Sequence, residues 1–148
     1  EGFPMSLLVS MNMIGSGLTA ERLRMDIALQ NIANQNTTRT ANGEPYRRKQ
    51  VVFYERGMSF SDALRTESAK VEGGGVRVTE VVESQRDFIP VYDPDHPDAN
   101  EEGYVMMPNV NTTEERVDLM AASNSYEANL TALKLVQSLA LKALDIGK

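Results

Sequence analysis

The chain has 148 residues, of which 41% are hydrophobic and 6% aromatic, and a formal net charge of −6. This length suits one domain, and the scarcity of aromatic residues argues against a large aromatic-lined substrate pocket. The acidic balance argues against a nucleic-acid ligand, because phosphate binding requires a clustered basic surface, and the absence of cysteine excludes disulfide bonds and thiolate metal sites.

The first four residues, EGFP, precede Met5, and residues 1–4 are expected to be a cloning remnant. The fold prediction therefore begins at residue 5. No charged-then-apolar signal peptide opens the chain, and no run of 18 apolar residues occurs, so no membrane span is predicted.

A heptad pattern in the first part of the chain predicts a helix from about residue 7 to about residue 34. Asn34, Asn36 and Thr37 then favour side-chain-to-backbone hydrogen bonds over further helix. Their side chains either cap the turn locally or bond backbone groups of a neighbouring subunit, and the pattern is compatible with both. The apolar positions of the heptad are expected to form an assembly interface: Leu7, Met11, Ile14, Leu18, Met25 and Ile32.

The period of the pattern changes between residues 43 and 111. The runs RRKQVVFY and VRVTEVV alternate and are rich in β-branched residues, which predicts two strands, and the basic residues of the first run are expected on a solvated strand face. Pro90 in DFIPVYDP removes a ladder donor and predicts an edge strand. Residues 58–70 are expected to form a loop with a short helical turn. Because helices and strands do not alternate, we expect a small, mostly antiparallel β-rich insert.

A second long heptad pattern predicts a helix from about residue 114 to about residue 144. Thr112 or Thr113 is expected to be its N-cap, with Glu114 and Glu115 as charges that favour the helix N-terminus. The C-terminal half is apolar over more than half its circumference, so it requires more than one helical neighbour. Its expected interface residues are Leu119, Tyr126, Leu130, Leu133, Val136, Leu139 and Leu144.

These elements predict an α+β fold in which long N- and C-terminal helices form a coiled-coil-like pair. The helical core is expected to comprise residues 5–42 and 112–148, and the β-rich insert and loop residues 43–111.

No constellation for catalysis, metal binding or a cofactor is evident. The single histidine, His96, lies among Asp93, Asp95 and Asp98, but Pro97 stands where a calcium loop needs an oxygen ligand, and zinc needs further His or Cys ligands. A hydrolase that uses His96 with a nearby serine is a minor alternative. We therefore expect no enzyme activity, no cofactor and no small-molecule substrate.

The stretch NIANQNT resembles a motif near the N-terminus of flagellar axial proteins, which are rod, hook and related subunits. The matching residues are Asn31, Ile32, Ala33, Asn34, Asn36 and Thr37. SYEAN, at residues 125–129, and PYRRKQVVF, at residues 45–53, are similar to segments of this family. The loop HPDANEEGYV and its flanks resemble the part that distinguishes one proximal-rod subunit from its relatives, through Asp93, His96, Pro97, Gly103 and Tyr104.

The resemblance implies a structural subunit of the bacterial flagellar basal body. Such a subunit would polymerise through its terminal helices to build the proximal rod of the drive shaft that transmits motor torque. The implied partners are copies of itself, FlgB and neighbouring rod proteins, FliE and the inner-membrane ring junction. It would leave the cell through the flagellar type III export apparatus, without a cleaved signal peptide, and lie in the periplasm-spanning rod.

An alternative function is a soluble helical adaptor or chaperone-like module that uses its long helices to hold one partner. The mass of the complex discriminates between them. An adaptor gives a small defined complex, whereas a rod subunit gives ring-sized or open-ended assemblies.

Overall fold

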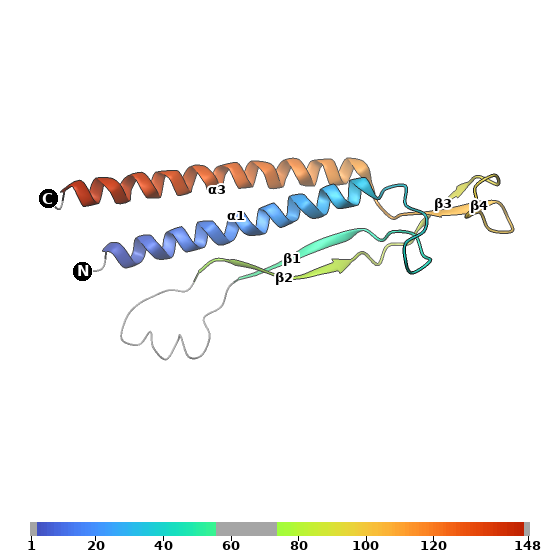
Figure 1. Cartoon of the computed structure of the whole chain (residues 1–148), viewed down its shortest axis with the longest axis horizontal. Helices are drawn as coiled ribbons and strands as arrows, with labels where there is room; N and C mark the ends of the chain where they lie inside the picture. Colours follow the sequence, from blue (N-terminus) through green and yellow to red (C-terminus); the bar gives the residue numbers. More distant parts are fainter. Residues whose placement is uncertain (1–2, 56–73, 147–148) are drawn as a thin grey trace, which may run out of the picture. The chain divides into compact units, whose positions relative to one another are not determined.

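The computed structural model describes residues 3–55 and 74–146. The fold is α+β, as predicted. One long helix lies at each end of the chain, and the strands come between them in the sequence (Figure 1). The expected helical turn at residues 58–70 lies outside the described residues. The elements are α1 (Phe3–Ala33), β1 (Lys49–Glu55), β2 (Val76–Glu83), β3 (Ile89–Tyr92), β4 (Tyr104–Met107) and α3 (Thr112–Ile146).

The chain divides into two compact units, and each contains parts of both helices. One unit comprises residues 1–23, 53–79 and 122–148, and the other comprises residues 24–52 and 80–121. We call them the helical-end unit and the hairpin unit. Contacts are described below within each unit.

The two helices are antiparallel neighbours. In the hairpin unit, Arg24 of α1 forms an ion pair with Asp118 of α3, whereas Asn31, further along α1, bonds Glu115, earlier in α3. In the helical-end unit, a Cβ at Gly17 of α1 would lie 3.2 Å from the amide nitrogen of Asn129 in α3. Among the described residues, neither helix combines the length and the apolarity needed to cross a membrane.

Small and polar residues occupy the buried positions of the helices. The buried helical residues are Ala20 and Ala122 in the helical-end unit, and Ala28, Asn31 and Glu115 in the hairpin unit. Small side chains let two helix backbones approach closely, which larger side chains would prevent. The heptad pattern therefore locates the helices correctly, but the most buried helical residues are not its large apolar members.

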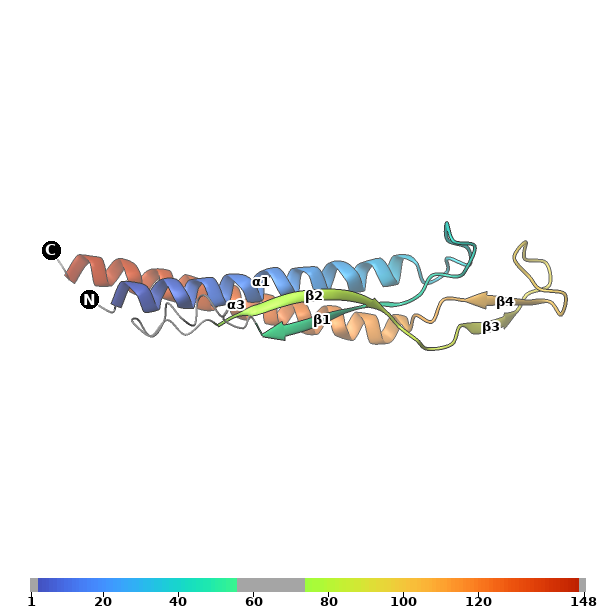
Figure 2. The same cartoon turned by 90° about the horizontal axis from the view of Figure 1, so that it is seen from below.

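The strands form two separate two-stranded sheets, β1–β2 and β3–β4 (Figure 2). The Ser84 amide, just after β2, donates to the Arg48 carbonyl, just before β1, at 2.8 Å, so this pair is antiparallel. The β3–β4 pair is also antiparallel, with Ile89 opposite Met107 and Tyr92 opposite Tyr104. The expected antiparallel insert is thus confirmed, but as two ladders. Pro90 lies in an edge strand, as predicted, because both strands of a two-stranded sheet are edges.

Candidate assembly site

A buried polar cluster joins the end of α1 to the start of β1 and the start of α3. Its centre is Asn31, which is 1% exposed. The Asn31 amide nitrogen donates to the Lys49 carbonyl and to Glu115 Oε2, both at 2.8 Å. Asn31 Oδ1 accepts from the Tyr46 hydroxyl and from the Lys49 amide, both at 2.9 Å. Both donors and both acceptor positions of the side chain are therefore used.

A buried ion pair completes this cluster. The guanidinium of Arg48 donates from Nε to Glu115 Oε1, and the exposed fractions of the two side chains are 11% and 1%. Because Asn31 bonds the other carboxylate oxygen, each oxygen of Glu115 has a partner. Burial, followed by the charges of Glu115 and Glu83, raises the pKa of Tyr46 to about 12 from its ordinary 10.0. The neutral hydroxyl of Tyr46 is thus retained as a donor to Asn31.

The other motif residues end the helix. Asn34 Nδ2 donates to the Gln30 carbonyl at 2.9 Å, and the Thr37 hydroxyl donates to Asn34 Oδ1 at 3.1 Å. The side chain of Asn34 therefore makes local capping bonds at the end of α1, and that of Asn31 is used inside the chain. Ile32 is half-buried, and Ala33 and Asn36 are exposed at the surface.

Asparagine residues also fix the start of α3. Asn111 is the N-cap, because its Oδ1 accepts from the amides of Thr113 at 3.0 Å and Glu114 at 3.4 Å. The expected cap at Thr112 or Thr113 is therefore wrong by one or two residues, and Thr112 instead donates to Gln35 Oε1 at 2.7 Å. Glu115 lies in the first turn of α3, as expected of a helix-start charge, but it is buried in the polar cluster.

Asp98 ties the loop between β3 and β4 to the loop that follows α1. Its two oxygens accept from the Thr38 hydroxyl at 2.8 Å and pair with the Arg39 guanidinium at 2.7 Å. His96 accepts at Nδ1 from the Asp98 amide at 3.0 Å, which makes it part of a tight turn. Asp93 and Pro97 are exposed, and the Asp93 amide donates to the carbonyl of Gly103 at 2.9 Å. Over the described residues, no group of three His, Cys, Asp or Glu side chains is arranged to hold a metal ion.

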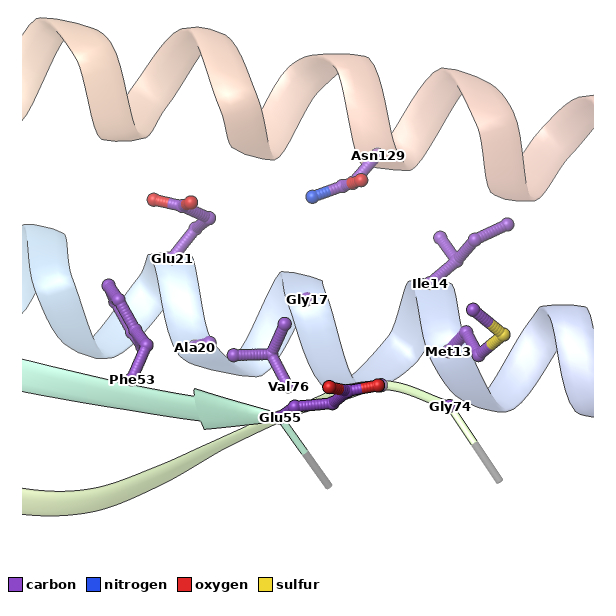
Figure 3. A pocket seen from close by; sticks show the side chains of 11 residues that line it. Met13, Ile14, Gly17, Ala20, Glu21, Phe53, Glu55, Gly74, Val76 and Asn129 are labelled. Carbon is purple, nitrogen blue, oxygen red and sulfur yellow. The ribbon is translucent and has the colours of Figure 1, made fainter. Parts of the chain in front are cut away.

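A groove of about 560 Å³ lies in the helical-end unit between α1, α3 and the sheet (Figure 3). Its lining is mainly apolar, with Ile14 and Ala20 from α1 and Phe53 and Val76 from the strands. Asn129 projects from α3 toward Gly17, as Figure 3 shows. The Ser16 hydroxyl accepts from the Val76 amide at 3.0 Å and so holds β2 against α1. Its polar lining residues include Glu21, Glu55 and Asn129.

The expected helix interfaces are only partly covered within the chain. All six expected residues of α1 are half-buried: Leu7, Met11, Ile14, Leu18, Met25 and Ile32. In α3 the half-buried residues are Leu119, Tyr126, Leu130, Leu133 and Val136. Leu139 and Leu144 are exposed, as are Leu135 and Leu141 of the second apolar flank expected on this helix. Val117 and Met120, which were not among the expected interface residues, are exposed too. A substantial apolar surface is therefore open along α3.

Sequence reasoning missed four members of the polar cluster and its border: Tyr46, Arg48, Asn109 and Glu115. The expected solvated face is wrong for Arg48, because its backbone amide donates to Asn109 Oδ1 at 2.7 Å and its side chain meets Glu115. One signal was available, since Glu115 occupies the same heptad position as the buried Ala122 seven residues later. An acidic residue in such a position requires a buried partner.

Comparison with known proteins places these features in a wider context. Residues 101–146 match the family described as "Flagellar basal body rod FlgEFG protein C-terminal". The chain is 47% identical to the flagellar basal-body rod protein FlgC of Bacillus subtilis, over 97% of this chain and 100% of that protein. It is 40% identical to FlgC of Borreliella burgdorferi, over 96% and 98% of the two chains. The identity to FlgC of Salmonella typhimurium is 41%, over 97% and 100%.

Proposed function

Because the chain belongs to the FlgC family of flagellar basal-body rod proteins, we propose that it is a subunit of the proximal rod, the inner part of the drive shaft that transmits motor torque. The family is structural, so the chemistry expected of the chain is assembly rather than catalysis. The expected interfaces are the apolar faces of α1 and α3, packed in a coiled-coil-like manner against neighbouring subunits.

The apolar surface of α3 is the observation that supports this proposal most directly. Leu135 and Leu139 are four residues apart and share one flank of the helix, and Leu141 and Leu144 are three apart and share another. Leu135 and Leu144, nine residues apart, lie about 180° apart at 3.6 residues per turn. Their exposed fractions are 62% and 69%. Apolar surface on opposite flanks of one helix requires at least two neighbours.

The energetics favour assembly over an isolated chain. Covering one exposed leucine contributes about 1.5–3 kcal/mol, and each of the four leucines near the end of α3 is available in every copy. Such gains must exceed the loss of translational and rotational freedom, which costs roughly 4–15 kcal/mol for each association. Several helix contacts for each subunit therefore make the polymer stable where one contact would not. Closely packed helices also give the stiffness that torque transmission requires.

The buried polar cluster has a supporting role in this proposal. It fixes where α1 ends and where α3 begins, so the helices present their outer faces in a defined register. The proposed partners are further copies of this chain, FlgB and neighbouring rod proteins, and FliE at the inner-membrane ring junction. The proposed route is the flagellar type III export apparatus without a cleaved signal peptide, and the proposed location is the periplasm-spanning rod.

Substitution on the outer face of α3 tests this proposal. Leu139→Asp places a charge on the apolar flank without touching the buried cluster, and Ser138→Asp adds the same charge at the neighbouring exposed position. We expect L139D to abolish motility and to be missing from purified basal bodies, and S138D to retain both. Normal motility and incorporation of L139D would contradict the assigned face.

The helix content of the free chain is a second measurement. If α1 and α3 gain order from their neighbours, the far-ultraviolet circular dichroism of dilute protein will show less helix than that of assembled material. Equal helix content would argue against assembly-dependent ordering. A small complex of defined mass with one partner, in place of ring-sized assemblies, would support an adaptor instead.

A further inference from the structure

The β3–β4 hairpin has one face that nothing in the hairpin unit covers. Side chains alternate along a strand, so Pro90 and Tyr92 of β3 share a face with Met106 and Tyr104, which lie directly opposite them. All four are exposed, and Tyr92 is 65% exposed. We call this set the tyrosine face. On the other face, Val105 is buried and Met107 is half-buried, whereas Ile89 and Val91 are exposed.

The tyrosine face is held in a fixed shape before any partner binds. The rings of Tyr92 and Tyr104 pack edge to face, with centroids 5.3 Å apart and planes at 69°. The backbone of Gly103 has a φ of +81°, and a Cβ there would lie 3.0 Å from a ring carbon of Tyr92. The contacts of Asp98 with Thr38 and Arg39 anchor the loop. Rigid tyrosines offer large contact areas at little cost in side-chain entropy, which is typical of binding hot spots.

The segment that carries the tyrosine face is strongly acidic. Residues 87–115 contain eight acidic residues and no lysine or arginine. Asp98, Glu114 and Glu115 have basic partners within the chain. Within the part of the chain that the structure describes, the other five form no ion pair, and all are exposed: Asp87, Asp93, Asp95, Glu101 and Glu102. A surface of this kind repels an identical surface and attracts a basic one.

Basic side chains of the hairpin unit are largely engaged already. Arg24, Arg39, Arg48 and Arg86 form ion pairs with carboxylates of the same unit. Two others form cation–π contacts: the Arg47 guanidinium lies 4.3 Å from the ring centre of Phe88, and the Lys49 ammonium lies 5.7 Å from that of Tyr46. Only Arg116, among the described residues of this unit, is exposed without an ion pair. A second hairpin unit therefore offers this face few available cations. The charge balance therefore disfavours a second hairpin unit as the partner.

We propose that the tyrosine face of the β3–β4 hairpin docks a different protein, whose surface presents an apolar patch bordered by lysine or arginine. This inference rests on the proposed function in one respect, which is that the partner is expected among the other components of the basal body. The hairpin then recognises another component, while the helix faces bind neighbouring rod helices.

Site-specific photo-cross-linking in flagellated cells tests this proposal. A benzophenone amino acid replaces Met106 on the tyrosine face, and in a matched control it replaces Met107, on the opposite face of the same strand. We expect Met106 to yield an adduct with a different protein, whose cross-linked peptide contains lysine or arginine. The double variant Glu101→Gln/Glu102→Gln should lower the adduct yield about fivefold or more, because it removes two negative charges that attract a basic partner surface.

Three results would overturn the proposal: an adduct between two copies of this chain, no adduct, or an equal adduct from Met107. If the Met106 variant is absent from basal bodies, the same cross-linker at Tyr92 replaces it in the test. Detection of the native chain in the same basal-body preparations distinguishes a failure of the docking surface from a failure of the proposed function. Its presence without a Met106 or Tyr92 adduct contradicts the docking surface alone, and its absence contradicts the proposed function.

Discussion

Removal of the Glu115 carboxylate should destabilise the hairpin unit far more than removal of its neighbour. Glu115→Ala leaves the Arg48 guanidinium without its carboxylate and one amide hydrogen of Asn31 without its acceptor. Glu114→Ala removes an exposed ion pair, because Glu114 and Arg86 are 47% and 64% exposed. The two variants delete the same side chain at adjacent helical positions, so their helix propensities match.

The expected magnitudes differ because burial differs. Breaking a buried ion pair by deleting one partner costs about 3–5 kcal/mol, since a charge remains in a medium that solvates it poorly. An exposed pair contributes about 0–1 kcal/mol. E115A should therefore lower the ratio of folded to unfolded protein at least a hundredfold, at about 1.4 kcal/mol for each factor of ten. Glu115→Gln keeps the volume and loses the charge, and should give an intermediate loss.

Urea unfolding followed by circular dichroism measures these differences, and hydrogen exchange at the Lys49 amide localises them. That amide donates to Asn31 Oδ1, so its protection reports on the cluster directly. We expect E115A to lose protection at Lys49 and E114A to keep it. If E115A unfolds at the same urea concentration as E114A, the buried cluster does not stabilise the unit and the reasoning fails.

Three further changes are expected to alter stability. Tyr46→Phe should cost about 1 kcal/mol at pH 7 through the lost bond to Asn31. Because the pKa of Tyr46 is raised from 10.0 to about 12, its contribution is complete below pH 10 and is lost as the pH rises toward 12; urea titrations of wild type and Y46F that stay parallel across this range would refute this. Gly15→Ala should raise the melting temperature, because no atom lies within 4 Å of the new Cβ and alanine favours helix by up to about 1 kcal/mol; a lower melting temperature would contradict the open space assigned there. Gly103→Ala should cost more than Gly43→Ala in urea unfolding, since both have positive φ but only the Cβ at Gly103 meets other atoms; equal losses would show that those contacts are unimportant.

The residue pattern predicts the elements with little help from tertiary contacts. Heptad spacing locates both helices to within a few residues of α1 and α3, and alternation locates β1 and β2. These signals are local, because the side-chain period of a helix or strand repeats within a few residues. The motif around Asn31 and the similar segments at residues 45–53, 96–105 and 125–129 are likewise contiguous stretches, which is why the amino-acid sequence by itself reveals the family. The strand β4 has no comparable signal, because its four residues carry no clear alternation and only pairing with β3 defines it.

Tertiary structure alone decided which polar residues are buried. Asn31 and Glu115 are separated by 84 positions, and no local pattern relates them. Whether a carboxylate at a helix start is solvated or buried depends on what lies opposite, here Arg48 and Asn31. The cost of burying an unpaired charge makes these residues interdependent, so they are correct only as a set. The sequence therefore determined where the helices and strands form, and the folded chain determined which side chains hold them in register.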